Sequence, residues 1–203
     1  MKQEAEKWKS SFSNSELSSW EGNIKALKDL FRMASKKSIE FMNCLVMIEV
    51  CISEDLRADC IIIGKNVRQE AMVVVMELKQ WSESFITKPE SEEDVRAGKV
   101  ITNYPCDRLR LHPSRQVSDY RWHLSSSPSF QNCEINHAGM AYCYNCEKGM
   151  QTYKVLYDKA YDDYLKECKL YTRKTKNNLV KSLLSNLHNG CGQEVYNRIN
   201  STS

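Results

Sequence analysis

The stretch from residue 20 to residue 56, WEGNIKALKDLFRMASKKSIEFMNCLVMIEVCISEDL, carries regularly spaced apolar side chains. Successive apolar positions are separated by four and then three residues, with one break at Ser38. A seven-residue repeat of this kind lets α-helices pack side by side. We therefore predict a long helix that begins near Ser15 and Glu16. Its apolar positions are Trp20, Ile24, Leu27, Phe31, Ala34, Phe41, Leu45, Ile48, Ile52 and Leu56.

A second apolar stretch, from Val67 to Phe85, continues the helical prediction until Pro89 closes it. Gly64 and Asn66 can bend the chain between the two stretches. A continuous helix over residues 17–87 would be about 105 Å long at about 1.5 Å per residue. This length favours a helical bundle or a coiled coil.

The rest of the chain divides by composition. Residues 90–147 hold Pro105, Pro113 and Pro128 and show no lasting period, whereas helical spacing returns near Met150 and a stop is expected at Asn189-Gly190. The predicted fold is all-α: an elongated antiparallel helical bundle or coiled coil with a long irregular insertion. The predicted parts are a polar N-terminal segment 1–15, a helical region 16–89, an irregular insertion or loop 90–147, a basic helix 148–190 and a flexible tail 191–203.

The composition agrees with this prediction. The chain has 203 residues, with 41% hydrophobic and 27% charged side chains and only 7 glycines and 4 prolines, too few turn formers for an all-β sandwich. Residues 1–100 carry 15 Lys and Arg against 17 Asp and Glu, a net charge of −2. Residues 101–203 carry 14 against 9, a net charge of +5 that permits an anionic partner.

The location expected from the sequence is cytoplasmic, with peripheral attachment to membranes. The charged start of the chain lacks the apolar core of a signal peptide, and no apolar run approaches the roughly 20 residues that cross a bilayer. Several of the 9 cysteines fall within helical patterns, as buried thiols of a reducing compartment do.

No catalytic motif stands out. The sequence has no glycine-rich phosphate loop, no dinucleotide fingerprint, no nucleophile elbow and no paired-histidine metal helix. The four histidines are scattered, and a Cys133/His137 nucleophilic pair would lack an orienting third group. We therefore expect a protein that is not an enzyme and that works by binding and assembly.

One group of residues has metal-ligand chemistry. Cys143 and Cys146 form a CxxC pair that suits a tetrahedral zinc ion, and Cys133 and His137 precede it. A single CxxC pair is a weak signal, and incidental thiols explain it better. Zinc is thus a minor alternative to the expectation of no cofactor.

Basic residues cluster near the end of the predicted basic helix. They suit either a solvated helix face or a surface for anionic lipid headgroups, each contributing about 1 kcal/mol near a bilayer. Nucleic acid is not expected as a partner, because the tyrosines follow the period of a helical core and form no stacking platform. The lipid-binding candidates are Lys166, Lys169, Arg173, Lys174, Lys176 and Lys181.

Residues 40–56 resemble the FCH segment that opens F-BAR domains, with Phe41, Ile48, Glu49, Ser53 and Leu56 on the family pattern. Tyr153, Tyr157, Ala160, Tyr164 and Cys168 look like the third F-BAR helix. Leu45, Val46 and Ile52 depart from the pattern, and the matches cover about half of the chain.

The resemblance implies a homodimeric scaffold that binds anionic membranes through long helices and links membrane shape to cytoskeletal or trafficking proteins, as in endocytosis. The alternative is a helical protein–protein adaptor without membrane activity, with or without a small zinc-stabilised insertion.

Overall fold

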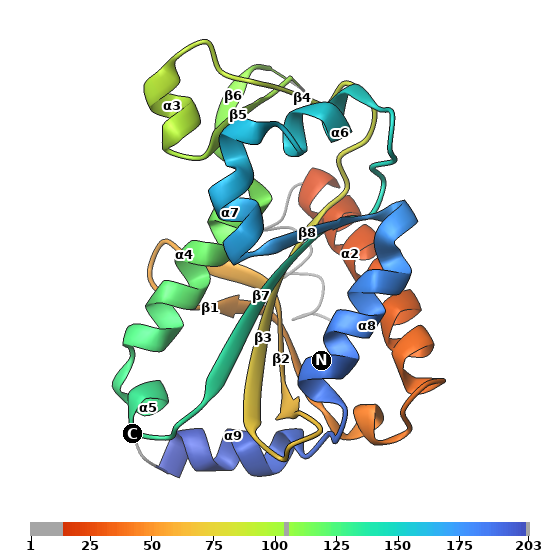
Figure 1. Ribbon diagram of the computed structural model, residues 1–203, viewed down its shortest axis with the longest axis vertical. Helices are drawn as coiled ribbons and strands as arrows, with labels where there is room; N and C mark the ends of the chain where they lie inside the picture. The colour runs from red at the N-terminus through yellow and green to blue at the C-terminus, as the bar shows by residue number, and fades with distance from the viewer. Residues whose placement is uncertain (1–13, 104–105, 202–203) are drawn as a thin grey trace, which may run out of the picture.

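The computed structural model describes residues 14–103 and 106–201, and its centre is a mixed β-sheet (Figure 1). The sheet has five strands in the order β1-β2-β3-β7-β8. They are β1 (Leu45–Cys51), β2 (Arg57–Lys65), β3 (Ala71–Lys79), β7 (Asn136–Cys143) and β8 (Lys169–Thr172). The strands β1, β2 and β3 are antiparallel neighbours, whereas β7 runs parallel to both β3 and β8.

Two helices cover one face of this sheet. They are α2 (Asn14–Ser35) and α8 (Lys176–Leu187), which contact each other. Leu27 and Leu30 of α2 and Leu183 of α8 pack against the sheet residues Ile62 and Val74 in one buried cluster. In Figure 1 both helices lie on the same side of the strands.

The opposite face is covered by α4 (Pro113–Ser126) and α9 (Gly192–Ser201), with the short α5 (Pro128–Gln131) between them. Val195 of α9 and Tyr120 of α4 pack against Ile61 and Val73. The approach of α4 requires a glycine in β7, because a Cβ on Gly139 would lie 2.4 Å from Val117 Cγ1.

A smaller lobe stands beyond the ends of β3 and β7. It holds the antiparallel sheet β4-β5-β6 with strands β4 (Ile86–Thr87), β5 (Lys99–Thr102) and β6 (Arg108–Leu111). Four short helices belong to this part of the chain: α3 (Glu92–Arg96), α6 (Gln151–Leu156), η2 (Lys159–Tyr161) and α7 (Asp162–Glu167). Two 3-10 turns, η1 (Glu40–Asn43) and η3 (Arg173–Thr175), complete the described elements. No helix of the described residues is long and apolar enough to cross a membrane.

The prediction of an all-α bundle or coiled coil is wrong, because both predicted long-helix stretches contain strands of the central sheet. The longest described helix is α2, with 22 residues. The segment that resembles an FCH helix forms η1, the edge strand β1 and the turn before β2, so the F-BAR and coiled-coil descriptions are wrong as well. Runs such as Ile61-Ile62-Ile63 and Val73-Val74-Val75 are β-branched, and covered on both faces they form buried strands without polar alternation.

The other predicted segments also differ from the structure. Residues 90–147, expected to be irregular, contain α3, β5, β6, α4, α5 and the central strand β7. Residues 148–190, expected to form one basic helix, contain α6, η2, α7, β8, η3 and α8. The expected flexible tail 191–203 contains α9, and most of the expected polar segment 1–15 lies outside the described residues.

Candidate functional site

The six lipid-binding candidates are spread over four elements. Lys166 lies in α7, Lys169 in β8, Arg173 and Lys174 in η3, and Lys176 and Lys181 in α8. Three of them form ion pairs: Lys166 with Asp163 at 3.1 Å, Arg173 with Glu147 at 3.4 Å, and Lys176 with Asp29. The single basic helix face that suggested lipid contact is therefore not present.

The four zinc candidates do not come together. Cys133 precedes β7 and His137 is near its start, whereas Cys143 ends the strand and Cys146 follows it. The six steps from His137 to Cys143 along the strand span about 20 Å, so one ion cannot reach both side chains. Cys143 and Cys146 lie in one turn, where the Cys146 amide donates to the Cys143 carbonyl at 3.2 Å. Within residues 14–103 and 106–201, no group of three or more His, Cys, Asp and Glu side chains is placed to hold a metal ion.

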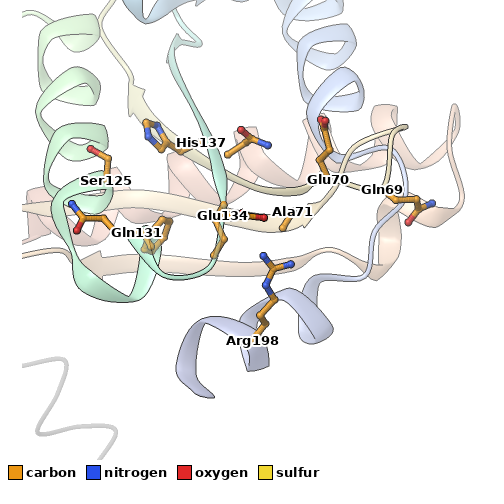
Figure 2. A pocket seen from close by; sticks show the side chains of 11 residues that line it. Gln69, Glu70, Ala71, Ser125, Gln131, Glu134, His137 and Arg198 are labelled. Atoms are coloured by element: carbon orange, nitrogen blue, oxygen red, sulfur yellow. The ribbon is translucent and has the colours of Figure 1, made fainter. Parts of the chain in front are cut away.

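His137 instead lines a cavity of about 560 Å³ at the opposite end of the sheet (Figure 2). Glu70, Glu134 and Arg198 also line it. His137 Nδ1 accepts a hydrogen bond of 3.3 Å from Arg121 Nε, and its pKa is lowered by burial and by the nearby Arg121 charge. The walls of this cavity therefore carry charges of both signs.

A pair of carboxylates occupies the adjacent ends of β2 and β3. The antiparallel β2–β3 ladder ends at Cys60↔Met76, and Asp59 and Glu77 are the next residues beyond that pair, close enough for the Glu77 charge to act on Asp59. Glu77 is only 2% exposed, and Asp59 is half-buried. The Leu78 amide donates to Asp59 Oδ2 at 2.7 Å, which fixes that carboxylate against β3. Two acids at neighbouring sheet positions repel each other, so this arrangement requires compensation from another charge.

Burial and the neighbouring charges perturb this pair. Burial, followed by the Glu77 charge, raises the pKa of Asp59 from 3.8 to about 7. Lys79 lies two residues beyond Glu77 on β3 and forms an ion pair with it. Burial alone would lower the pKa of Lys79, but the Glu77 and Asp59 carboxylates outweigh it, so the pKa is raised and Lys79 stays charged. Perturbed groups gathered in a cleft are typical of functional sites.

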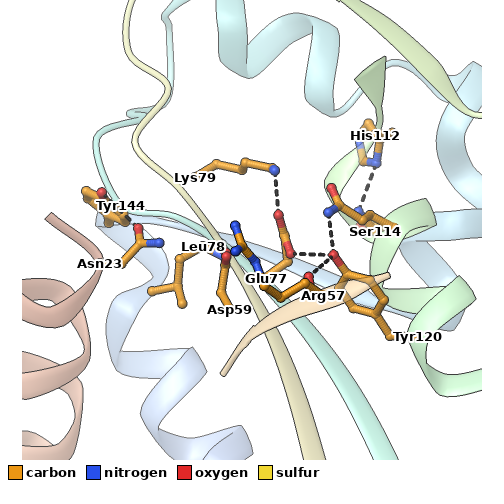
Figure 3. Close-up of polar contacts among 11 residues, drawn as sticks. Asn23, Arg57, Asp59, Glu77, Leu78, Lys79, His112, Ser114, Tyr120 and Tyr144 are labelled. Carbon is orange, nitrogen blue, oxygen red and sulfur yellow. Dashed lines mark hydrogen bonds and ion pairs between the residues drawn. The ribbon is translucent and has the colours of Figure 1, made fainter. Parts of the chain in front are cut away.

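The positions of Glu77 and Lys79 are set by aromatic neighbours, of which Figure 3 shows Tyr120 beside Glu77. Tyr120 of α4 contacts Glu77 Oε2 through its hydroxyl at 3.1 Å and donates to the Arg57 carbonyl at 2.8 Å. The Lys79 ammonium lies 5.5 Å from the centre of the Trp81 ring, a cation–π contact. Both side chains are thus held by a rigid frame of strand and helix.

A third carboxylate, Glu49 of β1, extends the acidic row across a third strand. Its backbone has a φ of +56°, and the β1–β2 ladder is interrupted at Glu49 and Asp59, between the pairs Ile48↔Cys60 and Val50↔Ala58. Glu49 Oε2 lies 2.8 Å from Arg57 Nε. Burial raises the pKa of Glu49. The Glu77 charge raises it further, whereas the Arg57 charge lowers it, and the net shift is upward. We call Glu49, Asp59, Glu77 and Lys79 the acidic centre.

The acidic centre borders a cleft of about 590 Å³, which we call the β2–β6 cleft. Arg57, Arg108 and Arg110 line it together with Asp59 and Lys79. Arg108 and Arg110 come from β6, an edge strand of the small sheet, and both are exposed. Positions two apart on a strand share a face and lie about 7 Å apart. The cleft therefore has the Asp59 carboxylate in its lining, the buried Glu77 behind it and a basic rim.

This site was missed by sequence reasoning, although one signal was present. Glu77 and Lys79 lie at the end of the apolar run of β3, and Asp59 directly precedes the apolar run of β2. Charged residues at the ends of fully apolar strands are costly to bury unless they are paired or functional. The 17 residues between Asp59 and Glu77 hide their proximity in the sequence, which only the pairing of β2 with β3 creates.

Comparisons with protein-family models, with curated proteins and with solved structures found no match for this chain.

Proposed function

We propose that this protein is a divalent-metal-dependent nuclease that hydrolyses phosphodiester bonds at the acidic centre. One observation carries the proposal: Asp59 and Lys79 line a cleft whose rim is arginine-rich, and the buried Glu77 lies directly behind them, paired with Lys79 and close enough to raise the pKa of Asp59. Carboxylates bind a hard cation, and arginines bind the phosphates that would share it.

The carboxylate pair suits magnesium or manganese. Mg²⁺ commonly uses one or two protein carboxylates and takes its other ligands from water and substrate phosphate, so it does not require a cage of three protein ligands. A carboxylate offers about four acceptor positions, so the bond from the Leu78 amide leaves Asp59 acceptor capacity. When bound, such an ion polarises the phosphate and lowers the pKa of a coordinated water.

Side chains of the protein would stabilise the transition state, orient Glu77 and bind the substrate phosphates. Lys79, held beside Glu77 and over Trp81, supplies a fixed positive charge where negative charge develops on the phosphate. Tyr120 orients Glu77 through the contact to Oε2. Arg108 and Arg110 hold phosphates at the rim of the cleft.

A polymeric substrate fits better than a small phosphate ester. The arginines of β6 lie on an exposed edge strand, so a chain of phosphates can follow the strand past the acidic centre. The basic rim attracts polyanions, and neighbouring arginines can engage successive phosphates.

This proposal departs from the sequence-based expectations of a non-enzymatic protein and of no nucleic-acid partner. Those expectations relied on the absence of catalytic motifs and on placing the tyrosines in a predicted helical core. The membrane scaffold required long paired helices, and none of the described helices exceeds 22 residues. Lipid binding, homodimer formation, the zinc-stabilised adaptor and a cytoplasmic, membrane-peripheral location stay predictions.

The test is a cleavage assay with the full chain. Labelled single-stranded DNA, duplex DNA and RNA are incubated with Mg²⁺, with Mn²⁺ or with EDTA. We expect cleavage only with a divalent cation. The variants Glu77→Gln and Lys79→Ala should each cut at least about a hundredfold more slowly, because several kcal/mol of transition-state stabilisation would be lost.

Glu70→Gln is the matched control, because Glu70 lines the cavity at the opposite end of the sheet. It makes the same acid-to-amide change and should cleave at the wild-type rate. Cleavage that persists in EDTA, or that Glu77→Gln leaves intact, would contradict the proposal.

A further inference from the structure

A third hollow lies on the α2 side of the central sheet and has a volume of about 880 Å³. Its walls are α2 on one side and the η3–α8 junction on the other, and its floor comes from residues that follow β3 and end β7. We call it the α2 groove and define it by Lys25, Lys28, Arg32, Tyr144, Arg173 and Lys176. Two of these, Arg173 and Lys176, are among the residues that the sequence suggested for lipid contact.

Positive charge lines both walls of the α2 groove. Lys25, Lys28 and Arg32 are exposed and spaced three and four residues apart, so they form one stripe along α2. Arg173, 67% exposed, stands on the other wall. Of the seven charged residues lining the groove five are basic and two, Glu21 and Asp29, are acidic. The hydrogen bond from Lys176 lowers the pKa of Asp29, so Asp29 is a firm anchor between the two walls.

Tyr144 forms part of the floor. Its hydroxyl donates to Asn23 Oδ1 of α2 at 3.1 Å, which fixes the plane of the half-buried ring. The close approach of α2 depends on Gly22, where a Cβ would lie 2.6 Å from the Tyr144 hydroxyl. A fixed tyrosine between basic walls is the combination that binds single-stranded nucleic acid, in which bases stack on rings and phosphates meet cations.

The α2 groove adjoins the acidic centre. Gln80, which lines the groove, directly follows Lys79, and the Tyr144 amide donates to the Lys79 carbonyl at 3.0 Å. The pKa of Tyr144 is raised to about 12, mainly by burial and next by the charge of Asp59, which shows that the two side chains are near each other. Figure 3 shows Asp59 between Tyr144 on one side and Glu77 on the other.

We propose that the α2 groove binds a single-stranded segment of the nucleic acid whose scissile phosphate lies at the acidic centre. This inference rests on the proposed nuclease function and specifies its substrate: a single strand, or a duplex with a single-stranded end. In a paired duplex the bases are stacked on each other, so they cannot also stack on a ring at the floor of a groove. The strand would run from the arginines of β6, past Asp59 and Glu77, to Tyr144 and the lysines of α2.

The experiment measures binding without cleavage. Fluorescence anisotropy follows the full chain binding a labelled oligothymidylate of roughly 20 nucleotides in EDTA, over a range of salt concentrations. The variant Lys25→Glu/Lys28→Glu should bind at least about tenfold more weakly, and its slope of log affinity against log salt should be smaller by about 1.4, since each lost phosphate contact contributes about 0.7. Tyr144→Leu should weaken binding about tenfold, by the stacking energy of one base, and leave the salt slope unchanged.

The matched control is Lys166→Glu/Lys181→Glu, which changes the charge equally at positions outside both the α2 groove and the β2–β6 cleft. It should bind as the wild type does. Three results would each overturn the inference. The two double variants could lose affinity equally, or Lys25→Glu/Lys28→Glu could bind as the wild type does. The third is that Lys25→Glu/Lys28→Glu loses as much affinity for a blunt duplex as for the single strand.

Failure of the groove and failure of the nuclease are distinguishable. If the wild type binds the oligonucleotide through the groove but cuts nothing with Mg²⁺ or Mn²⁺, the nuclease proposal fails and the groove stands. If the wild type cuts while the groove variants bind normally, only the groove inference fails.

Discussion

Replacing Asp59 with asparagine should stabilise the protein in EDTA above neutral pH. Asp59 is half-buried beside Glu77, and its pKa in the folded protein is raised from 3.8 to about 7. Between these two values the folded state holds a proton that the unfolded state releases. The stabilising contribution is therefore fully present below pH 3.8 and is lost as the pH rises through about 7.

The size of the effect follows from the shift. About three pKa units at about 1.36 kcal/mol each give an upper value of about 4 kcal/mol. Asparagine has nearly the same shape, and its oxygen can still accept the hydrogen bond from the Leu78 amide. At pH 8 the Asp59→Asn variant should thus unfold with a free energy about 2–4 kcal/mol larger than that of the wild type, and at pH 4 the two should agree within about 1 kcal/mol.

These differences are measured by urea unfolding at pH 4, 6 and 8 in EDTA, with circular dichroism as the signal. A second series with Mg²⁺ tests the link to function. A cation at one hundred times its dissociation constant should stabilise the wild type by about 2.7 kcal/mol, and the variant much less. A pH-independent difference between the two proteins, or equal stabilisation of both by Mg²⁺, would refute the reasoning.

Two further predictions concern the frame of the site. Tyr120→Phe removes the hydroxyl that contacts Glu77 and the Arg57 carbonyl, so urea unfolding should show a loss of about 1–3 kcal/mol; no loss would mean that the contacts add nothing. His112 is buried, and its pKa is lowered to about 4 by burial, although its bond to the Leu156 carbonyl opposes the shift. It stays neutral in the fold, so the stability advantage of the wild type over His112→Gln should shrink by about 3 kcal/mol between pH 7 and pH 4, and a constant difference would contradict this assignment.

Part of the fold could be predicted from local pattern. The helical spacing from Trp20 to Ala34 is confirmed as part of α2, and the stop expected at Asn189-Gly190 follows the last residue of α8, with Gly190 at a φ of +63°. In both places a single element determines its own pattern: one face of α2 packs on the sheet, and the turn requires a residue that tolerates positive φ.

The strands could not be separated from helices by periodicity. The apolar positions Leu45, Ile48 and Ile52 fit a heptad spacing, yet the first two lie in β1 and the third follows its end. Short apolar runs suit a buried strand as well as a buried helix, and the β-branched composition of 61–63 and 73–75 was the better guide.

The sequence by itself determined where chain segments are apolar, where α2 runs and where α8 stops, because these features depend on neighbours within a few residues. Only the tertiary structure decided the site. Asp59 and Glu77 are 18 residues apart, and Tyr144 lies a further 67 residues along the chain. The antiparallel register of β2 and β3 joins the first two, and the parallel pairing of β3 with β7 brings Tyr144 beside Lys79. Register is set by the burial of whole sheet faces, so it cannot be deduced from the residues at the site alone.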